Sequence, residues 1–143
     1  MEESLTYLKE QFELPDVDVR SYSPLVLAYI GDGIYELVIR TAVVGQGNRQ
    51  ANALHKKTST YVKASAQAAM MEAILEDLTE EELAVYKRGR NAKTVSMAKH
   101  ATMHDYRHAT GFEALMGYLY LTDQMKRMID LIKIGMERTG GTP

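Results

Sequence analysis

The stretch LAYIGDGIYELVIR, residues 27–40, constrains the fold more than any other segment, because it is almost entirely apolar yet contains charged side chains four residues apart. On a helix that rises about 1.5 Å per residue, Asp32, Glu36 and Arg40 stack along one face at intervals of about 6 Å. The other faces are apolar, which predicts a helix buried on most sides with one polar stripe. Glu36 and Arg40 are expected to form an ion pair, but Asp32 has an acidic neighbour at i+4. Two such carboxylates repel each other unless a cation lies near them.

A second segment has the same character: ATGFEALMGYLYL, residues 109–121, contains Glu113 as its only charge. Glycines lie near the acid in both segments, although each one disfavours a helix interior by about 1 kcal/mol. These glycines are Gly31, Gly33, Gly111 and Gly117. Because a buried carboxylate is unfavourable unless it is paired or bound to a metal, the two helices are predicted to bring Asp32 and Glu113 together around a Mg²⁺ ion. The alternative is that Glu113 pairs with a basic side chain such as Arg107 or Lys57.

The rest of the chain predicts an all-α, compact single domain, because the apolar spacing is helical and alternating strand patterns are absent. Helix N-cap patterns occur at Ser23 with Pro24, at Thr79 with Glu82, and at Thr102. Residues 90–101 are predicted to form a loop. A short N-terminal helix and a linker are expected within residues 1–22, and residues 139–143 are expected to fray. The six longest predicted helices cover about residues 5–12, 24–44, 50–77, 80–89, 103–121 and 124–137.

Composition narrows the class of protein. A length of 143 residues fits one domain, and the content of 45% hydrophobic and 25% charged residues is ordinary for a globular protein. The absence of cysteine excludes disulfides and Cys-ligated zinc or iron–sulfur sites. No N-terminal targeting segment and no apolar run of about 20 residues is present, so we expect a cytoplasmic protein that does not enter membranes.

Positive charge is concentrated in two segments although the net charge is −2. Residues 49–63 contain four basic side chains and no acid, and residues 87–107 contain six basic side chains and one acid. If both segments lie on the surface, they could present a positive face to a polyanion. The alternative for each segment is an ordinary solvated surface.

The two acidic segments resemble the ribonuclease III family. LAYIGDGIYEL, residues 27–37, is similar to its signature helix, and FEALMGYLYL, residues 112–121, is similar to its second acidic helix. LHKKTSTYVKASAQA, residues 54–68, and KRGRNAK, residues 87–93, resemble the helix and loop between them. The wording of these segments and the short length resemble the Mini-ribonuclease III branch. The resemblance covers about residues 23–121.

This resemblance implies an all-α endoribonuclease domain that acts on double-stranded RNA as a homodimer, with Mg²⁺ held by Asp32 and Glu113 as the catalytic residues. No part of the chain is left for a separate double-stranded-RNA-binding domain. The branch implies maturation of the 23S ribosomal RNA precursor in a bacterial cytoplasm, and a large-subunit ribosomal protein is a candidate partner. The wider family has four acids at its metal site, but two of those positions are Ala28 and Thr110 here. The reduced set implies weaker metal binding.

Contacts with RNA are expected at phosphates and 2′-hydroxyls, because side chains cannot read the deep major groove of A-form RNA. Glu36 and Arg40 are predicted to support the acidic site. The candidate RNA-binding residues are Lys56, Lys57, Lys63, Arg88, Arg90, Asn91 and Lys93.

Two other metal sites can be assembled from the sequence. His100, His104 and His108 recur every four residues, which could indicate zinc, but they straddle the predicted helix start and no cysteine or matching acid completes the set. His104 with Asp105 also spells the dipeptide of HD-type metal phosphohydrolases, which would need His55 upstream and Asp123 or Asp130 downstream. A non-catalytic, helical rRNA-binding or ribosome-assembly module is the third alternative. None of these alternatives explains acids inside two apolar helices.

Overall fold

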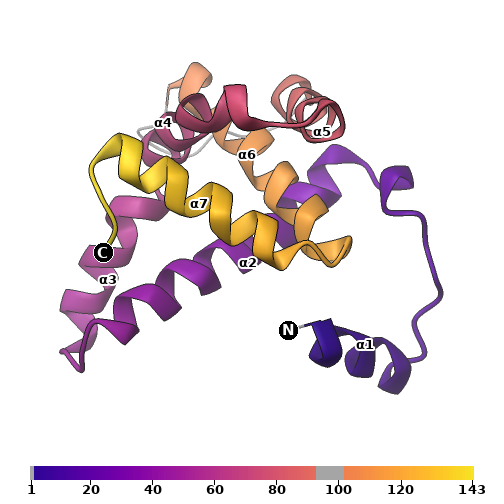
Figure 1. The fold of residues 1–143 in the computed structure, drawn as a ribbon, viewed down its shortest axis with the longest axis horizontal. Helices are drawn as coiled ribbons and strands as arrows, with labels where there is room; N and C mark the ends of the chain where they lie inside the picture. The colour runs from indigo at the N-terminus through magenta and orange to yellow at the C-terminus, as the bar shows by residue number, and fades with distance from the viewer. Residues whose placement is uncertain (1, 93–101) are drawn as a thin grey trace.

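The computed structural model describes residues 2–92 and 102–143, and this part of the chain is helical and contains no strand (Figure 1). The all-α prediction is therefore confirmed. The α-helices are α1 Glu2–Gln11, α2 Pro24–Gly45, α3 Ala51–Val62, α4 Ala64–Ile74, α5 Glu80–Asn91, α6 Met103–Leu121 and α7 Met125–Thr139. Two short 3₁₀ helices, η1 Val19–Ser21 and η2 Leu75–Asp77, lie between them.

The core forms around α6, which packs against α2, α4 and α5, while α7 covers α4 (Figure 1). Every residue of α6 from Ala109 to Leu119 is buried except Glu113. The Tyr35 ring of α2 meets Phe112 edge to face, with ring centroids 4.9 Å apart. Helix α1 stands apart from this body on the linker that leads to α2 (Figure 1). Glu113 is the single charged residue in this buried stretch of α6, and a charged side chain is unusual in such surroundings.

Helices α2 and α6 touch through their backbones at two glycines. A Cβ atom at Gly31 would overlap the carbonyl oxygen of Glu113, and a Cβ atom at Gly117 would overlap the carbonyl oxygen of Leu27. No residue with a side chain fits at either position without separating the helices. Gly33 differs, because a Cβ atom there meets nothing within 4 Å.

The predicted helix starts are confirmed. The Ser23 side chain accepts a hydrogen bond from the backbone N–H of Val26 at 3.3 Å. The Thr79 side chain accepts from the backbone of Glu82, whose carboxylate accepts from the backbone N–H of Thr79 in return, which completes the capping box. Thr102 accepts from the backbone N–H of Asp105 at 3.0 Å.

The prediction of one helix over residues 50–77 is wrong. The chain breaks at Lys63, whose backbone is extended, so that α3 and α4 are separate helices and η2 follows. The carbonyl groups released at the break find other partners: the Tyr35 hydroxyl donates to the carbonyl of Tyr61, and Gln67 Nε2 donates to that of Val62, each at 2.8 Å. The apolar spacing continues across the break, which is why the sequence pattern did not reveal it.

The predicted loop at residues 90–101 begins later than expected. Helix α5 continues through Asn91, so Arg90 and Asn91 lie in its last turn. Residues 93–101, which include Lys93 and His100, lie outside the described residues.

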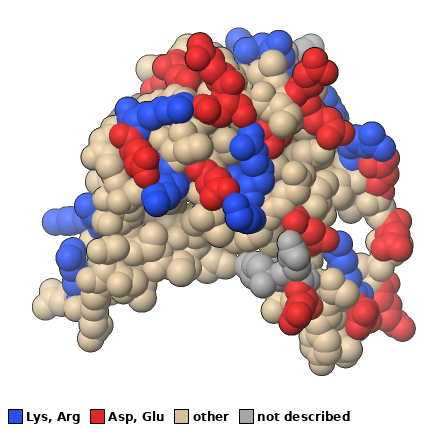
Figure 2. Space-filling model, viewed as in Figure 1, with Lys and Arg blue, Asp and Glu red and all other residues tan. Residues whose placement is uncertain are grey.

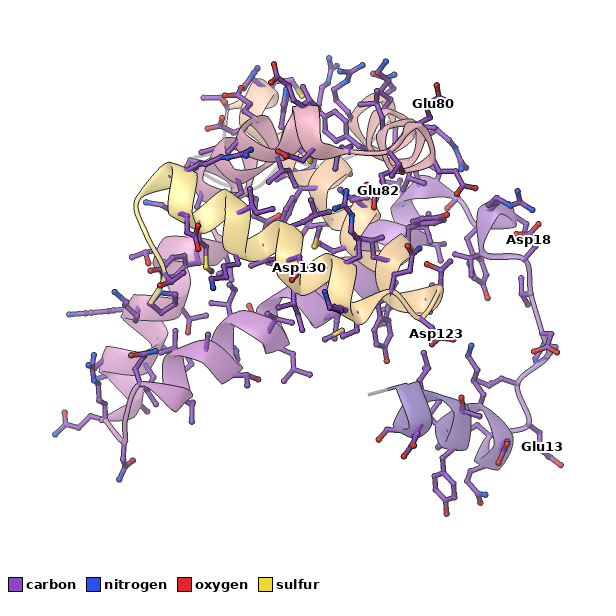
Figure 3. All side chains as sticks on the ribbon, viewed as in Figure 1. Glu13, Asp18, Glu80, Glu82, Asp123 and Asp130 are labelled. Carbon is purple, nitrogen blue, oxygen red and sulfur yellow. The ribbon has the colours of Figure 1, made fainter. Side chains whose placement is uncertain are left out.

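A buried ion pair joins α5 to α7. Glu82, which is 3% exposed, lies between the two helices (Figure 3) and accepts from Nε and Nη2 of Arg127 at 2.9 and 2.8 Å. The guanidinium of Arg127 lowers the pKa of Glu82 below its usual range. Arg127 also donates to the backbone carbonyl of Asp77 at 2.7 Å. The carboxylate that caps α5 thus also fixes α7.

Alanine substitutions at Gly31 and at Gly33, the two glycines beside Asp32, should have opposite effects on the free energy of unfolding. Gly31→Ala forces α2 away from α6 and should lower the free energy of unfolding by about 3 kcal/mol or prevent folding. Gly33→Ala adds a methyl group into open space within a helix and should raise that free energy by up to about 1 kcal/mol. Urea unfolding followed by circular dichroism measures both. Equal stability of the two variants would show that the backbones do not meet at Gly31.

Candidate active site

The crossing of α2 and α6 brings the carboxyl groups of Asp32 and Glu113 together. Asp32 is exposed, whereas Glu113 is partly buried beneath it. Burial, followed by the hydrogen bond with the Asp32 carboxyl and the charge of that group, raises the pKa of Glu113 to about 9. A hydrogen bond between two carboxyl groups requires a proton on one of them. The metal-free pair therefore holds a proton at neutral pH, and a divalent cation could take its place.

Gln67 of α4 belongs to this site and was not found from the sequence. Its side chain is 2% exposed and reaches Glu113, where its hydrogen bond opposes the upward shift of the pKa of that carboxyl. Its Nε2 also donates to the carbonyl of Val62, while its Oε1 is buried without a hydrogen-bond partner. A single amide in the small, apolar run ASAQAAM was the available signal.

The proposed pairing of Glu113 with a basic side chain is wrong. Among residues 2–92 and 102–143, no Lys, Arg or His forms an ion pair with Asp32 or Glu113. Lys57 lies instead over the ring of Tyr61, 5.8 Å from its centroid. Within the described residues, the two neighbouring carboxyl groups therefore have no protein cation to stabilise their charged forms.

The predicted ion pair on α2 is confirmed, since Arg40 Nη2 lies 3.0 Å from Glu36 Oε2. The two positions at which the wider family has acids are also buried: Ala28 is 8% and Thr110 is 7% exposed. The Thr110 hydroxyl donates to the carbonyl of Tyr106 at 2.9 Å. The described site thus contains two carboxylates rather than four.

These donors fit magnesium. Mg²⁺ prefers oxygen ligands, is commonly held by one or two carboxylates and keeps several waters. Asp32 and Glu113 supply two carboxylates from different helices, and the buried Oε1 of Gln67 is an acceptor that an ordered water can use. The small number of protein ligands predicts weak binding.

The candidate RNA-binding residues lie on two separate helices. Lys56 and Lys57 are exposed on α3 and Lys63 is exposed at its end, whereas Arg88, Arg90 and Asn91 lie on the last turns of α5. Figure 1 shows α3 and α5 far apart, and Figure 2 shows acidic and basic side chains mixed on the face that α7 covers. A positive surface that joins the two segments is therefore not on this face.

The basic side chains of α5 also contact the protein. Arg88 Nη2 donates to the carbonyl of Tyr22 at 3.3 Å. The guanidinium of Arg90 lies over the Tyr86 ring, 5.5 Å from its centroid, and its Nε donates to Asn91 Oδ1 at 3.4 Å. Substitution of either arginine would therefore alter local packing as well as charge.

The HD-type set is not assembled, because the cluster of metal-binding side chains around His104 in the described residues contains Glu72 and His108 but not His55, Asp123 or Asp130. His104 lies in the first turn of α6, whereas Asp123 follows the last turn, which places them about 28 Å apart along the helix axis. For the zinc alternative, His104 and His108 both lie within α6, whose start is where it was predicted, and His100 lies outside the described residues. An acid also accompanies them, since Glu72 of α4 lies close to both.

Comparison with known proteins decides the family. A family model described as the ribonuclease III domain matches residues 25–124. The chain belongs to the ribonuclease III domain family. Two relatives named Mini-ribonuclease 3 are similar over most of their length. The protein from Enterococcus faecalis is 50% identical over 127 residues, 87% of this chain and 96% of that protein. The protein from a Thermoanaerobacter species is 46% identical over 138 residues, 96% of this chain and 97% of that protein.

The same fold is also seen in a solved structure. A crystal structure of a protein from Fusobacterium nucleatum matches with a TM-score of 0.77 and 33% identity, and covers 86% of this chain and 98% of that one. Within this ribonuclease III domain, the family match includes Asp32, Gln67 and Glu113. No helix in the described residues is long and apolar enough to span a membrane.

Glu113→Gln should stabilise the metal-free chain at alkaline pH. Because the pKa of Glu113 is about 9 in the folded chain and about 4.5 when solvated, the folded state retains a proton between these values that the unfolded state loses. Stability therefore falls as the pH rises through that window. The amide does not titrate, so the variant should melt about 2–6 °C higher at pH 9 in EDTA and equally at pH 4. Glu137→Gln, an exposed acid on α7, is the control. Parallel pH profiles for Glu113→Gln and the original chain would contradict the assignment.

Proposed function

We propose that the chain is a Mg²⁺-dependent endoribonuclease that cleaves double-stranded RNA, with Asp32 and Glu113 as its catalytic residues. The observation that supports this most is the meeting of two carboxyl groups at the crossing of two apolar helices, where the part of the chain that the structure describes supplies no basic partner. Such an arrangement is unfavourable for a fold alone. Membership of the ribonuclease III domain family, and relatives named as ribonucleases, agree with it.

Mg²⁺, when bound, supplies positive charge at the scissile phosphate and lowers the pKa of a coordinated water. The chain provides the ligands in fixed positions, because Gly31 and Gly117 hold the two backbones in contact. Gln67 orients the Glu113 carboxyl from α4. Glu36 lies 3.0 Å from Arg40 and orders the solvent next to Asp32 on the same face of α2. The exposed Asp32 is the group that the RNA backbone meets first.

The substrate that we propose is the duplex stem of a 23S ribosomal RNA precursor, with a large-subunit ribosomal protein as a partner that could present it. RNA would be bound through phosphates and 2′-hydroxyls. Lys56, Lys57 and Lys63 are exposed on or directly after α3, and Arg88, Arg90 and Asn91 project from the end of α5. Because these groups lie on separate helices (Figure 1), a substrate that reaches both must be extended. A duplex satisfies that condition.

A second copy of the chain is the partner that the surface of α2 favours. Large apolar side chains on this helix are exposed, including Val26 at 47%, Tyr29 at 82%, Leu37 at 50% and Val44 at 58%. The spacing of these residues places them along one side of α2, close to the exposed Asp32. A two-fold dimer that covers this stripe would remove it from water. Two active sites would then lie on one assembly, one for each RNA strand.

Asp32→Asn should abolish cleavage without unfolding the chain, because the amide retains the size of the carboxylate but is a weak ligand for Mg²⁺. We expect turnover of a structured rRNA fragment in millimolar Mg²⁺ to fall about a hundredfold or more, because one of the two metal ligands is lost. The control, Glu137→Gln, should cleave normally. If the original chain and the control bound RNA but did not cleave it in Mg²⁺, the non-catalytic ribosome-assembly module would be favoured instead.

Lys56→Ala and Lys63→Ala should each weaken RNA binding by removing one phosphate contact. The slope of log K against log salt concentration should fall by about one for each variant, with similar losses on duplexes of different sequence. Lys133→Ala removes an exposed base of α7 that lies near Glu137 and is the matched control. Filter binding at several salt concentrations measures the slopes. An unchanged slope in both variants would remove α3 from the RNA-binding surface.

A further inference from the structure

A cluster of metal-binding side chains outside the candidate active site lies where the end of α4 meets the start of α6. Its members are Glu72, His104 and His108, and one ligand atom from each lies within 4.8 Å of the others. The two histidines are four residues apart on one helix, the spacing by which a helix presents two imidazoles to one metal ion. Glu72 Oε1 lies 3.6 Å from His104 Nε2, and both side chains are 60% exposed.

The hydrogen bonds of the histidine rings select which nitrogen can bind a metal. His108 Nδ1 lies 2.9 Å from the backbone carbonyl of His104. A carbonyl only accepts, so Nδ1 must carry the proton and Nε2 of the neutral ring has the lone pair. His104 Nδ1 lies 3.4 Å from Asp105 Oδ1, an equivalent arrangement with a carboxylate. Metal-binding histidines usually donate their second N–H to a carbonyl or carboxylate in this way.

The two rings are stacked, with centroids 4.0 Å apart and planes inclined by 25°. The two rings therefore lie side by side on α6, and a ring nitrogen of each lies within 4.8 Å of a Glu72 carboxylate oxygen. A tetrahedral zinc site with bonds of about 2.0–2.1 Å needs its ligand atoms about 3.3 Å apart. The ligand atoms now lie within 4.8 Å of one another, and rotation of the exposed Glu72 and His104 side chains would bring them to about 3.3 Å.

We propose that Glu72, His104 and His108 form a Zn²⁺ site, with water as the fourth ligand. Two imidazoles and one carboxylate are a ligand set that zinc accepts, whereas magnesium prefers oxygen ligands. The site would therefore select a different metal from the Asp32 and Glu113 pair. A simple ion pair between Glu72 and His104 accounts for one contact but not for His108, whose Nε2 then has no role.

Bound zinc would fix α4 to α6. These helices also bring Gln67 to Glu113, and His104 lies nine positions before Glu113 on α6, about 13 Å along the axis. The zinc site would thus be separate from the candidate active site but would clamp the same helix pair. The expected consequence is greater stability of the helix pair, independent of RNA cleavage.

Titration of ZnCl₂ into the full chain tests the site by calorimetry. The Asp32→Asn/Glu113→Gln background removes binding at the carboxylate pair, and we expect one zinc per chain to remain. His104→Ala, His108→Ala and Glu72→Ala in that background should each weaken the affinity at least about tenfold. His55→Ala, a histidine exposed on α3, should leave it unchanged. Zinc affinity that none of the three substitutions lowers would overturn the proposal.

Nitrogen-15 NMR of the histidine side chains provides an independent readout. Zinc should shift the Nε2 signals of His104 and His108 together, and leave His55 unaffected. Zinc should also raise the melting temperature of the original chain by a few degrees, but not that of Glu72→Ala. Because the Glu72 side chain is exposed, Glu72→Ala should fold normally, and circular dichroism verifies this. The absence of a zinc effect on its melting temperature would then report lost zinc binding rather than unfolding. Shifts at Nδ1, or at one ring only, would contradict the geometry.

Discussion

The contact between the backbones of α2 and α6 is the constraint on which the rest of the structure depends. It exists because Gly31 and Gly117 have no side chains, and a methyl group at either position would overlap the opposite helix. The same contact fixes the position of Asp32, which follows Gly31, and that of Glu113, whose backbone carbonyl faces Gly31. Packing and the candidate active site are thus consequences of one crossing. A substitution that loosens the core would also displace the carboxyl groups.

The electrostatics of that crossing explain why it suits a metal. Burial and the neighbouring Asp32 raise the pKa of Glu113 to about 9, and no basic side chain among the described residues offsets this. The helix break at Lys63 contributes as well, because it directs Gln67 toward both Val62 and Glu113. A cation between the carboxylates would replace a proton and stabilise both charges. The helix break at Lys63 and the close approach of Asp32 and Glu113 thus both shape the candidate active site.

Most of the fold and the central pair could be predicted from the sequence, because they depend on local patterns. Capping residues such as Thr79 mark the helix starts, and acids isolated in apolar helices indicate where two helices meet. The break at Lys63 could not be predicted, since the apolar spacing runs through it and the stabilising partners are distant in sequence. Gln67 and Glu72 were missed for a related reason. Their roles follow from how α4 packs on α6, and a pattern within one helix does not contain that information.

The most direct test of the central claim is to locate the bound cation by NMR, with Mn²⁺ as a paramagnetic substitute for Mg²⁺. Substoichiometric Mn²⁺ should first broaden the amide signals around Asp32, Gln67 and Glu113, and excess Mg²⁺ should restore them. Broadening centred elsewhere, or none that Mg²⁺ reverses, would contradict the claim that the crossing of α2 and α6 forms a magnesium site.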